Sequence, residues 1–168
     1  MQGGAGLTDK MGIKVHLKPA TLSDAEALHR MQATAFRPLL EKYNDFAISP
    51  AAESLDDLRE RLVRPDSTYY FIMDRGTAVG AIRVVDHRDP ERRKVIAPLF
   101  ILAQYRNRGY AQAAVRAVEA IHGEHGWALD TVREEPGNCH LYEKLGYRRT
   151  GTAARVRPNM TLIDYEKD

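Results

Sequence analysis

The sequence predicts a mixed α/β domain with a largely antiparallel sheet of six to seven strands flanked by about four helices. Three observations support this fold class. Two amphipathic helical segments come early in the chain, a run of three extended segments follows, and strands then alternate with helices to the end. With 168 residues, one domain over residues 12–168 is expected, preceded by a flexible extension over residues 1–11.

Composition excludes several classes of protein. The net charge of +2 is too small to indicate a nucleic-acid partner. No apolar run approaches the roughly 20 residues that span a bilayer, so no membrane association is expected. The single cysteine, Cys139, cannot form an internal disulfide, and this favours a cytoplasmic location.

The first elements follow from periodicity and capping. Apolar residues alternate with polar ones over residues 13–17, as in a half-buried strand. Ser23 and Glu26 form a capping-box pattern that predicts the start of a helix, and Pro38 predicts its end. A second helix is expected to begin near Ser54 or Leu55 and to end before Pro65.

The middle of the chain reads as a hairpin. Two extended segments flank a tight turn over residues 75–77, where Gly76 suits a positive φ. A charged loop over residues 87–94 leads to the next strand. The predicted strands here are 68–74, 78–86 and 95–102.

The remaining elements alternate. A helix that ends at Gly123 is expected to bury Ala114, Val118 and Ile121, which recur at i, i+4 and i+7. A shorter helix over residues 139–145 should stop at Gly146. The predicted strands of this part are 127–132, 147–156 and 160–166.

The segment 99–118 combines an apolar strand, a basic turn and an Ala-rich helix. The first turn of such a helix has unpaired backbone N–H groups and partial positive charge, which together favour phosphate oxygens. Gly109 allows a close approach of the backbone to a ligand. The same pattern also fits a strand-to-helix turn that binds nothing.

Two motifs resemble those of the GNAT superfamily of N-acetyltransferases. Arg106, Gly109 and Ala111 match the cofactor motif, and the string LYEKLGY over residues 141–147 is similar to the helix and strand that close the cofactor site. The resemblance covers most of the chain from about Thr68 onward. It implies a GNAT-type sheet and acetyl-CoA as the cosubstrate.

The resemblance also implies particular site residues. The pyrophosphate would lie on the turn and first helical residues, the pantetheine would run beside the preceding strand, and Tyr142 would contact the cofactor and act as the general acid. A tyrosine that only packs its ring in the core is the alternative for Tyr142. The implied cofactor-binding residues are Phe100, Ile101, Leu102, Arg106, Asn107, Arg108, Gly109, Tyr110, Ala111, Gln112, Asn138 and Tyr142.

The chain departs from the family pattern at three places. The family's motif Asn lies where this sequence has Glu135, so the motif alone does not assign Asn138 its expected role toward the pantetheine. Ala103 replaces a common Pro. Asn107 replaces a common Gly, and Asn tolerates the left-handed conformation.

The general base is not identified by the sequence. Asp130, Glu134 and Glu135 are each able to hold an ordered water, and each also reads as a solvated or capping charge. An acidic and aromatic cluster after the first helix either attracts a cationic amine or is an ordinary polar loop. Its members are Glu41, Tyr43, Asp45 and Phe46.

Other candidate groups have simpler interpretations. His87 and His140 lack partners at zinc-site spacing, so no metal is expected. Cys139 reads as a small packing residue. The basic residues Arg88, Arg92, Arg93 and Lys94 are interleaved with acids, which favours a solvated hairpin end over an RNA contact.

The sequence therefore predicts an N-acetyltransferase that transfers the acetyl group of acetyl-CoA directly to a primary amine of a small molecule or peptide. A non-catalytic acyl-CoA-binding sensor or partner module is the alternative. The sequence leaves the identity of the acceptor open. It also leaves open a homodimer formed through the sheet edge or the C-terminal strands.

Overall fold

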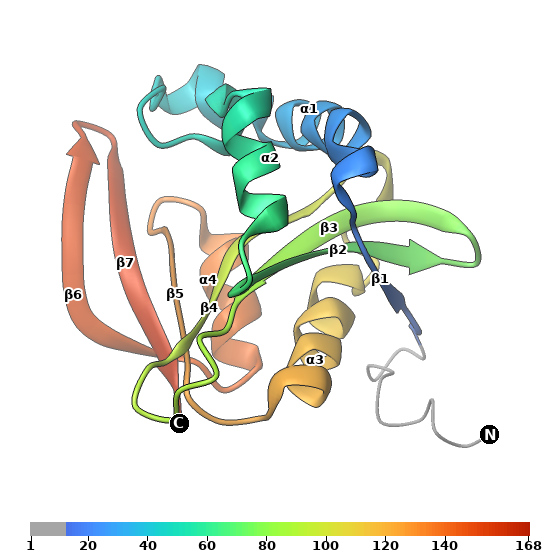
Figure 1. Cartoon of the computed structure of the whole chain (residues 1–168). Coiled ribbons are helices and arrows are strands. Elements are labelled where there is room, and N and C mark those ends of the chain that lie inside the picture. The colour runs from blue at the N-terminus through green and yellow to red at the C-terminus, as the bar shows by residue number, and fades with distance from the viewer. Residues whose placement is uncertain (1–12) are drawn as a thin grey trace.

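The computed structural model describes residues 13–168, so the predicted extension over residues 1–11 lies outside the described residues. One seven-stranded sheet has the order β1-β2-β3-β4-β5-β7-β6 (Figure 1). The strands are β1 (His16–Pro19), β2 (Ser67–Asp74), β3 (Thr77–Val85), β4 (Lys94–Ile101), β5 (Trp127–Val132), β6 (Arg148–Arg157) and β7 (Met160–Lys167). The α-helices of this range are α1 (Ala25–Tyr43), α2 (Leu55–Val63), α3 (Tyr110–His122) and α4 (Pro136–Lys144).

The predicted mixed, largely antiparallel sheet is confirmed. Neighbouring strands pair antiparallel except β4 and β5, which pair parallel. α1 and α2 lie over one face of the sheet, whereas α3 and α4 lie under the other (Figure 1). Within residues 13–168, no helix has the length and apolarity needed to cross a membrane.

Each face of the sheet has its own apolar core. Under α3 and α4 the core includes Trp127, Ile82 and Val118. On the α1 and α2 face a smaller cluster joins Leu28 and Leu58 of the helices to the sheet. The alternation of side chains along each strand supplies both cores from the same strands.

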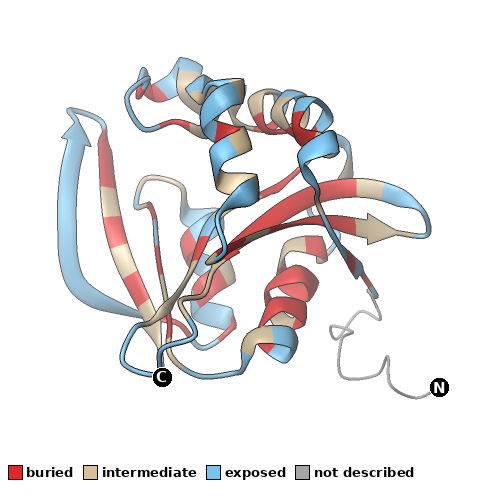
Figure 2. Cartoon of the chain, viewed as in Figure 1, coloured by how far each residue is buried: buried red, intermediate tan, exposed pale blue. Residues whose placement is uncertain are grey.

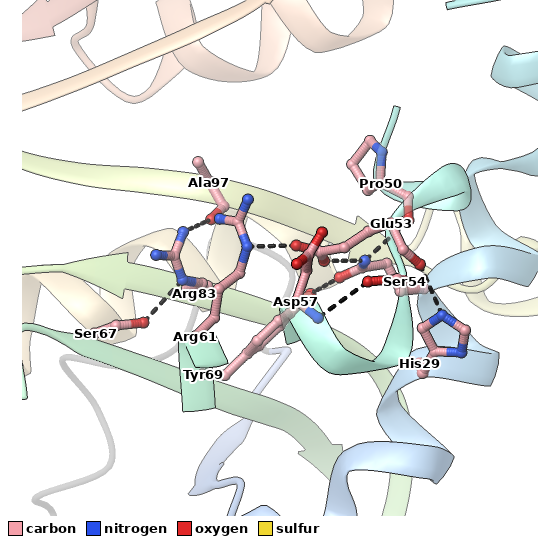
Figure 3. A network of polar contacts seen from close by, with 11 residues as sticks. His29, Pro50, Glu53, Ser54, Asp57, Arg61, Ser67, Tyr69, Arg83 and Ala97 are labelled. Atoms are coloured by element: carbon pink, nitrogen blue, oxygen red, sulfur yellow. Dashed lines mark hydrogen bonds and ion pairs between the residues drawn. The ribbon is translucent and has the colours of Figure 1, made fainter. Parts of the chain in front are cut away.

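A buried polar network attaches α1 and α2 to β2 (Figure 3). Tyr69 of β2 donates to Gln32 Oε1, and Gln32 Nε2 donates to Glu53 Oε1 at 2.8 Å and to the Pro50 carbonyl at 2.9 Å. Glu53 in turn accepts a hydrogen bond from Arg61 of α2. The network satisfies the polar atoms of the fully buried Gln32, as burial requires.

α1 differs from the sequence prediction at both ends. The capping box is formed by Thr21 and Asp24 around a short 3-10 turn, rather than by Ser23 and Glu26, because the chain turns into the helix two residues earlier. The helix also continues through Pro38 to Tyr43. Proline removes one helical hydrogen bond, and burial of Tyr43 in the last turn compensates for that loss.

Smaller differences concern three other elements. α4 begins at Pro136, three residues before the predicted start, because proline is favoured in the first helical position. β1 spans residues 16–19 rather than 13–17, since its pairing with β2 begins at His16. Ile121 is 56% exposed instead of buried, because the last turn of α3 extends past the core that covers Ala114 and Val118.

β6 forms one edge of the sheet, and all ten of its residues are exposed. Figure 2 shows this as an unbroken exposed ribbon beside β7, whose residues alternate between buried and partly exposed. β6 therefore contributes backbone pairing to the sheet but little to either core.

β3 and β4 approach closely at Gly80. Gly80 lies opposite Ile101 in the pairing, and a Cβ atom built on it would lie 2.1 Å from the carbonyl oxygen of Phe100. The obstacle is backbone rather than a flexible side chain, so it cannot move without separating the two strands. Glycine is required here for space.

We expect Gly80→Ala to lower the free energy of unfolding by at least about 2 kcal/mol, because the new methyl group overlaps backbone. Thermal unfolding should then occur roughly 4 to 8 °C lower. Gly137→Ala in α4 is the matched control, since a Cβ there meets nothing within 4 Å, and it should be neutral or stabilising. Equal melting temperatures for the two variants would contradict the assignment.

Candidate active site

β4 and β5 are paired over two residues and then diverge. The pairs are Lys94 with Trp127 and Val95 with Ala128, and Figure 1 shows the two strands running apart beyond them. From there β4 pairs with β3 alone and β5 with β7 alone. The facing edges of β4 and β5 are thus free to pair with something other than each other.

The turn after β4 presents the N-terminus of α3 beside this divergence. A 3-10 turn over Ala103–Tyr105 precedes it, and Gly109 caps the helix with φ of 89°. Among residues 13–168, no acceptor pairs with the backbone N–H groups of residues 109–112. Four free donors and the positive end of the helix dipole make this turn suitable for an anion.

Arg106 holds the turn in place. Its Nε donates to the Ile101 carbonyl at 3.0 Å, and its Nη2 donates to the Ala35 carbonyl of α1 at 3.2 Å. Ala35 lies three residues before Pro38, in the turn of α1 where proline interrupts the hydrogen-bond ladder. Arg106 therefore connects the end of β4 to α1, and its guanidinium is engaged by protein carbonyls.

The strand residues implied to contact the pantetheine have buried side chains or backbone groups bonded within the protein. Phe100 is buried on the α1 side, edge-on to Phe36 at 5.7 Å between ring centroids. Ile101 is buried in the opposite core. Leu102 follows the strand and donates its N–H to the Val79 carbonyl at 2.9 Å.

The other residues of the turn divide into exposed and buried ones. Asn107 is exposed with φ of 62°, the left-handed conformation that Asn tolerates, and Arg108 is exposed with its guanidinium over the Tyr105 ring. Tyr110 is buried and donates its hydroxyl to Asp74. Ala111 and Gln112 complete the first helical turn.

Tyr142 is buried in α4, but its hydroxyl is not satisfied. The ring lies 5.9 Å from the Tyr147 ring and 6.2 Å from that of Tyr165, measured between centroids. The hydroxyl has no hydrogen-bond partner among residues 13–168. In the same range, the side-chain atom that is both inaccessible to solvent and without a hydrogen bond is Asp45 Oδ1, not the Tyr142 hydroxyl. The Tyr142 hydroxyl therefore retains contact with solvent.

Burial raises the pKa of Tyr142, and the negative charge of Asp130 raises it further. The hydroxyl thus stays protonated at neutral pH and is available as a proton donor. Because α3 contacts β4 and α4 contacts β5, the free amides and this hydroxyl lie on the same face of the sheet, one on each side of the divergence.

Asn138 and Glu135 occupy different environments. Asn138 is exposed in the first turn of α4, and its side chain makes no hydrogen bond with the described residues. Glu135 accepts hydrogen bonds from Tyr43 at 2.5 Å and from Lys42 at 2.8 Å. Burial raises the pKa of Glu135, but these two hydrogen bonds outweigh it and leave the pKa below its ordinary value.

The other two acids also differ from each other. Glu134 accepts a hydrogen bond from the Thr161 N–H at 2.8 Å, which lowers its pKa. Asp130 has no such donor, and partial loss of hydration together with the neighbouring Asp164 raises its pKa. Of the three candidate bases, Asp130 is the one whose carboxylate is uncommitted among residues 13–168.

The acidic and aromatic cluster at the end of α1 contains both buried and exposed residues. Tyr43 and Asp45 are buried, whereas Glu41 is exposed and Phe46 is 65% exposed. Arg157 Nε donates to the Tyr43 carbonyl at 3.3 Å. The turn between β6 and β7 thus meets the end of α1, near Glu135.

The remaining candidates have structural partners. His87 Nδ1 lies 3.2 Å from Asp66, His140 is exposed, and Cys139 is buried with its sulfur 3.9 Å from the Val132 carbonyl. Within residues 13–168, no group of three or more His, Cys, Asp and Glu side chains is arranged to hold a metal ion.

Arg83 is a buried charge that sequence reasoning missed. Arg83 is 3% exposed in β3 and donates to the Ser67 hydroxyl and the Ala97 carbonyl. An arginine within a nearly continuous apolar run, which is typical of a strand covered on both faces, was the available signal.

Comparison with known proteins agrees with this geometry. The model of the acetyltransferase (GNAT) family matches residues 26–147. No curated protein matches the sequence.

Solved structures resemble the fold. The PaiA N-acetyltransferase of Thermoplasma acidophilum in complex with coenzyme A has a TM-score of 0.72 at 15% identity, over 93% of this chain and 100% of that chain. The spermidine N-acetyltransferase of Vibrio cholerae in complex with CoA and spermine has a TM-score of 0.70 at 17% identity, over 90% and 93%. An acetyltransferase of Thermus thermophilus has a TM-score of 0.66 at 19% identity, over 90% and 94%.

The structural likeness, at identities below one fifth, concerns the fold. The family model covers most of the chain, including both sequence motifs. The predicted enzyme class is thereby confirmed, and the chain belongs to the acetyltransferase (GNAT) family.

Proposed function

We propose that the protein is an acetyl-CoA-dependent N-acetyltransferase that acetylates a primary amine by direct transfer. The observation that carries the proposal is the pair of groups beside the divergence of β4 and β5: the free amides of residues 109–112 and the unpartnered hydroxyl of Tyr142. CoA-bound neighbours of the same fold support the choice of cosubstrate.

The chain's own residues fit the anionic and the extended parts of acetyl-CoA. The amides of Gly109 to Gln112 would bind the pyrophosphate, supported by the helix dipole. Leu102 and Phe100 present their backbone groups to β3, so the open edge of β4 at Leu99 and Ile101 would pair with the amide groups of the pantetheine, as a neighbouring strand does. Acetyl-CoA supplies an activated acetyl group.

The transfer requires two proton movements. A C–N bond forms as the thioester C–S bond breaks. The ammonium form of the acceptor gives up two protons to a base or solvent, and the departing CoA thiolate takes up one. Tyr142 would donate that proton and regain one from solvent. Asp130 is the carboxylate best suited to receive a proton from the acceptor, since Glu134 and Glu135 are already hydrogen-bonded.

The proposal is tested by following free thiol release with a panel of amines that includes amino acids, polyamines, lysine and peptide N-termini. An amine-dependent rate with a matching acetylated product is expected. Tight binding of acetyl-CoA without product from any amine would favour a non-catalytic sensor instead. A cytoplasmic location and a homodimer remain predictions.

Tyr142→Phe should lower kcat by about 100-fold or more, because the proton donor is lost while the ring is kept. The KM for acetyl-CoA should change little. Tyr70→Phe is the matched control, since the Tyr70 hydroxyl lies 2.8 Å from His122 Nε2 at the far end of α3. Undiminished kcat in the Tyr142 variant would remove the assigned role.

Asn107→Asp should weaken acetyl-CoA binding by about 10-fold, because it adds a negative charge beside the pyrophosphate with almost no change of shape. Calorimetric titration measures the effect. Asn44→Asp makes the same change at another left-handed position, at the end of α1, and should leave the affinity unaltered. If both variants bind acetyl-CoA like the parent protein, the phosphates lie elsewhere.

A further inference from the structure

Arg83 carries a buried positive charge without a counter-ion. Its Nε donates to Ser67 Oγ and its Nη1 to the Ala97 carbonyl, both at 2.8 Å. Among residues 13–168 no carboxylate forms an ion pair with it. Burial lowers its pKa to about 10, so the group remains charged at neutral pH. Buried charges are normally paired, and this one lacks its partner.

One nitrogen of Arg83 is left over. Nη2 has no hydrogen-bond partner among residues 13–168. It is not one of the solvent-inaccessible unbonded atoms of that range, so it has some contact with solvent. Arg61 of α2 lies next to it with 41% of its side chain exposed. Figure 3 shows the two guanidinium groups side by side near Ala97 of β4.

Two adjacent cations repel each other, and Arg61 is in fact a cause of the lowered pKa of Arg83. Glu53 accepts from Arg61. Its charge favours the protonated form of Arg83, but burial and the neighbouring arginines outweigh it, and Glu53 does not bond to Arg83. An anion that binds Arg83 Nη2 and the exposed part of Arg61 would relieve this repulsion. Paired guanidinium donors match the geometry of a carboxylate.

Charges of the opposite sign lie on the same face of the sheet. Asp130 of β5 and Asp164 of β7 are direct cross-strand neighbours, and neither carboxylate has a partner among residues 13–168. Trp127 and Leu129 point into the core under α3 and α4. Because side chains alternate, Asp130 points to the α1 and α2 face, as Arg83 does.

The two sets of charges flank β4 where it leaves β5. Val95 pairs with Ala128, so Ala97 and Asp130 are each two residues beyond that pair in parallel strands. Arg83 lies over Ala97 through its hydrogen bond to the Ala97 carbonyl. A basic group and an acidic group therefore face each other across the point where the strands begin to diverge.

We propose that the acceptor is a free α-amino acid, with its carboxylate on Arg83 and Arg61 and its ammonium group beside Asp130. The inference rests on the proposed N-acetyltransferase function and specifies its substrate class. In an α-amino acid, one carbon atom separates the two charged groups. Arg83 and Asp130 lie on β3 and β5, with β4 between them, but the Arg83 side chain reaches across to the Ala97 carbonyl of β4, which brings its guanidinium toward Asp130. The amine is thereby held next to the divergence that receives the thioester.

The first test compares neutral, acidic, basic and aromatic L-amino acids with their α-amides and with polyamines, using the unmodified protein. For the preferred side chain, kcat/KM for the acid should exceed that for the amide by about 10-fold or more. The amine of an amino-acid amide is less basic, so a larger fraction of it is neutral and reactive. Without a carboxylate site, the amides should therefore react faster than the acids. Amides or polyamines that react as well as the acids overturn the inference and leave the proposed function intact. No turnover with any amine overturns both.

A second test uses Arg61→Met with Arg59→Met as the matched control. Arg59 lies on the same helix with 43% of its side chain exposed, and it pairs with Asp56. Arg61→Met should raise the KM for the amino acid about 10-fold and leave the KM for its amide unchanged, whereas Arg59→Met should change neither. The ratio of kcat/KM for the acid to kcat/KM for the amide does not depend on how much of the protein is folded. An unchanged ratio in the Arg61 variant, or equal effects of both variants, contradicts the proposal.

Discussion

The divergence of β4 from β5 is the constraint on which the rest of the site depends. A parallel pair that lasts for two residues joins two half-sheets at one end only. Backbone N–H and C=O groups require partners, so each half-sheet is completed on its other side, by β3 and by β7. α3 supports one half and α4 the other. The free amides and the Tyr142 hydroxyl therefore lie on the two sides of the divergence.

α1 ties these parts together from the opposite face. Its middle turn holds Arg106 through the Ala35 carbonyl, and its last turn donates from Lys42 and Tyr43 to Glu135. The loop before β7 reaches the same place, where Asn159 donates to the Lys42 carbonyl. The turn after β4, the turn after β5 and the β6–β7 hairpin thus share one support.

Local signals in the sequence were sufficient for the fold and for the turn after β4 whose amides are free. Alternation located most strands within one or two residues, and Gly109 and Gly146 marked helix boundaries correctly. Long-range contacts were out of reach. Nothing local shows that Arg106 binds the Ala35 carbonyl or that Glu135 accepts from Tyr43, because these residues are far apart in the chain. Pro38 misled the prediction since tertiary burial of the following turn outweighs a local preference. The burial of Arg83 could not be predicted either, because it depends on α1 and α2 covering the second face of β3.

The exposed β6 ribbon has a bearing on solubility. An outer strand with unpaired backbone groups invites another chain to add to it. β6 carries arginines at positions 148, 149, 155 and 157, and like charges brought together by such stacking repel. This protection is electrostatic and is therefore screened by salt. Concentrated protein in high ionic strength loses the barrier that keeps these edges apart, although the folded core is unaltered.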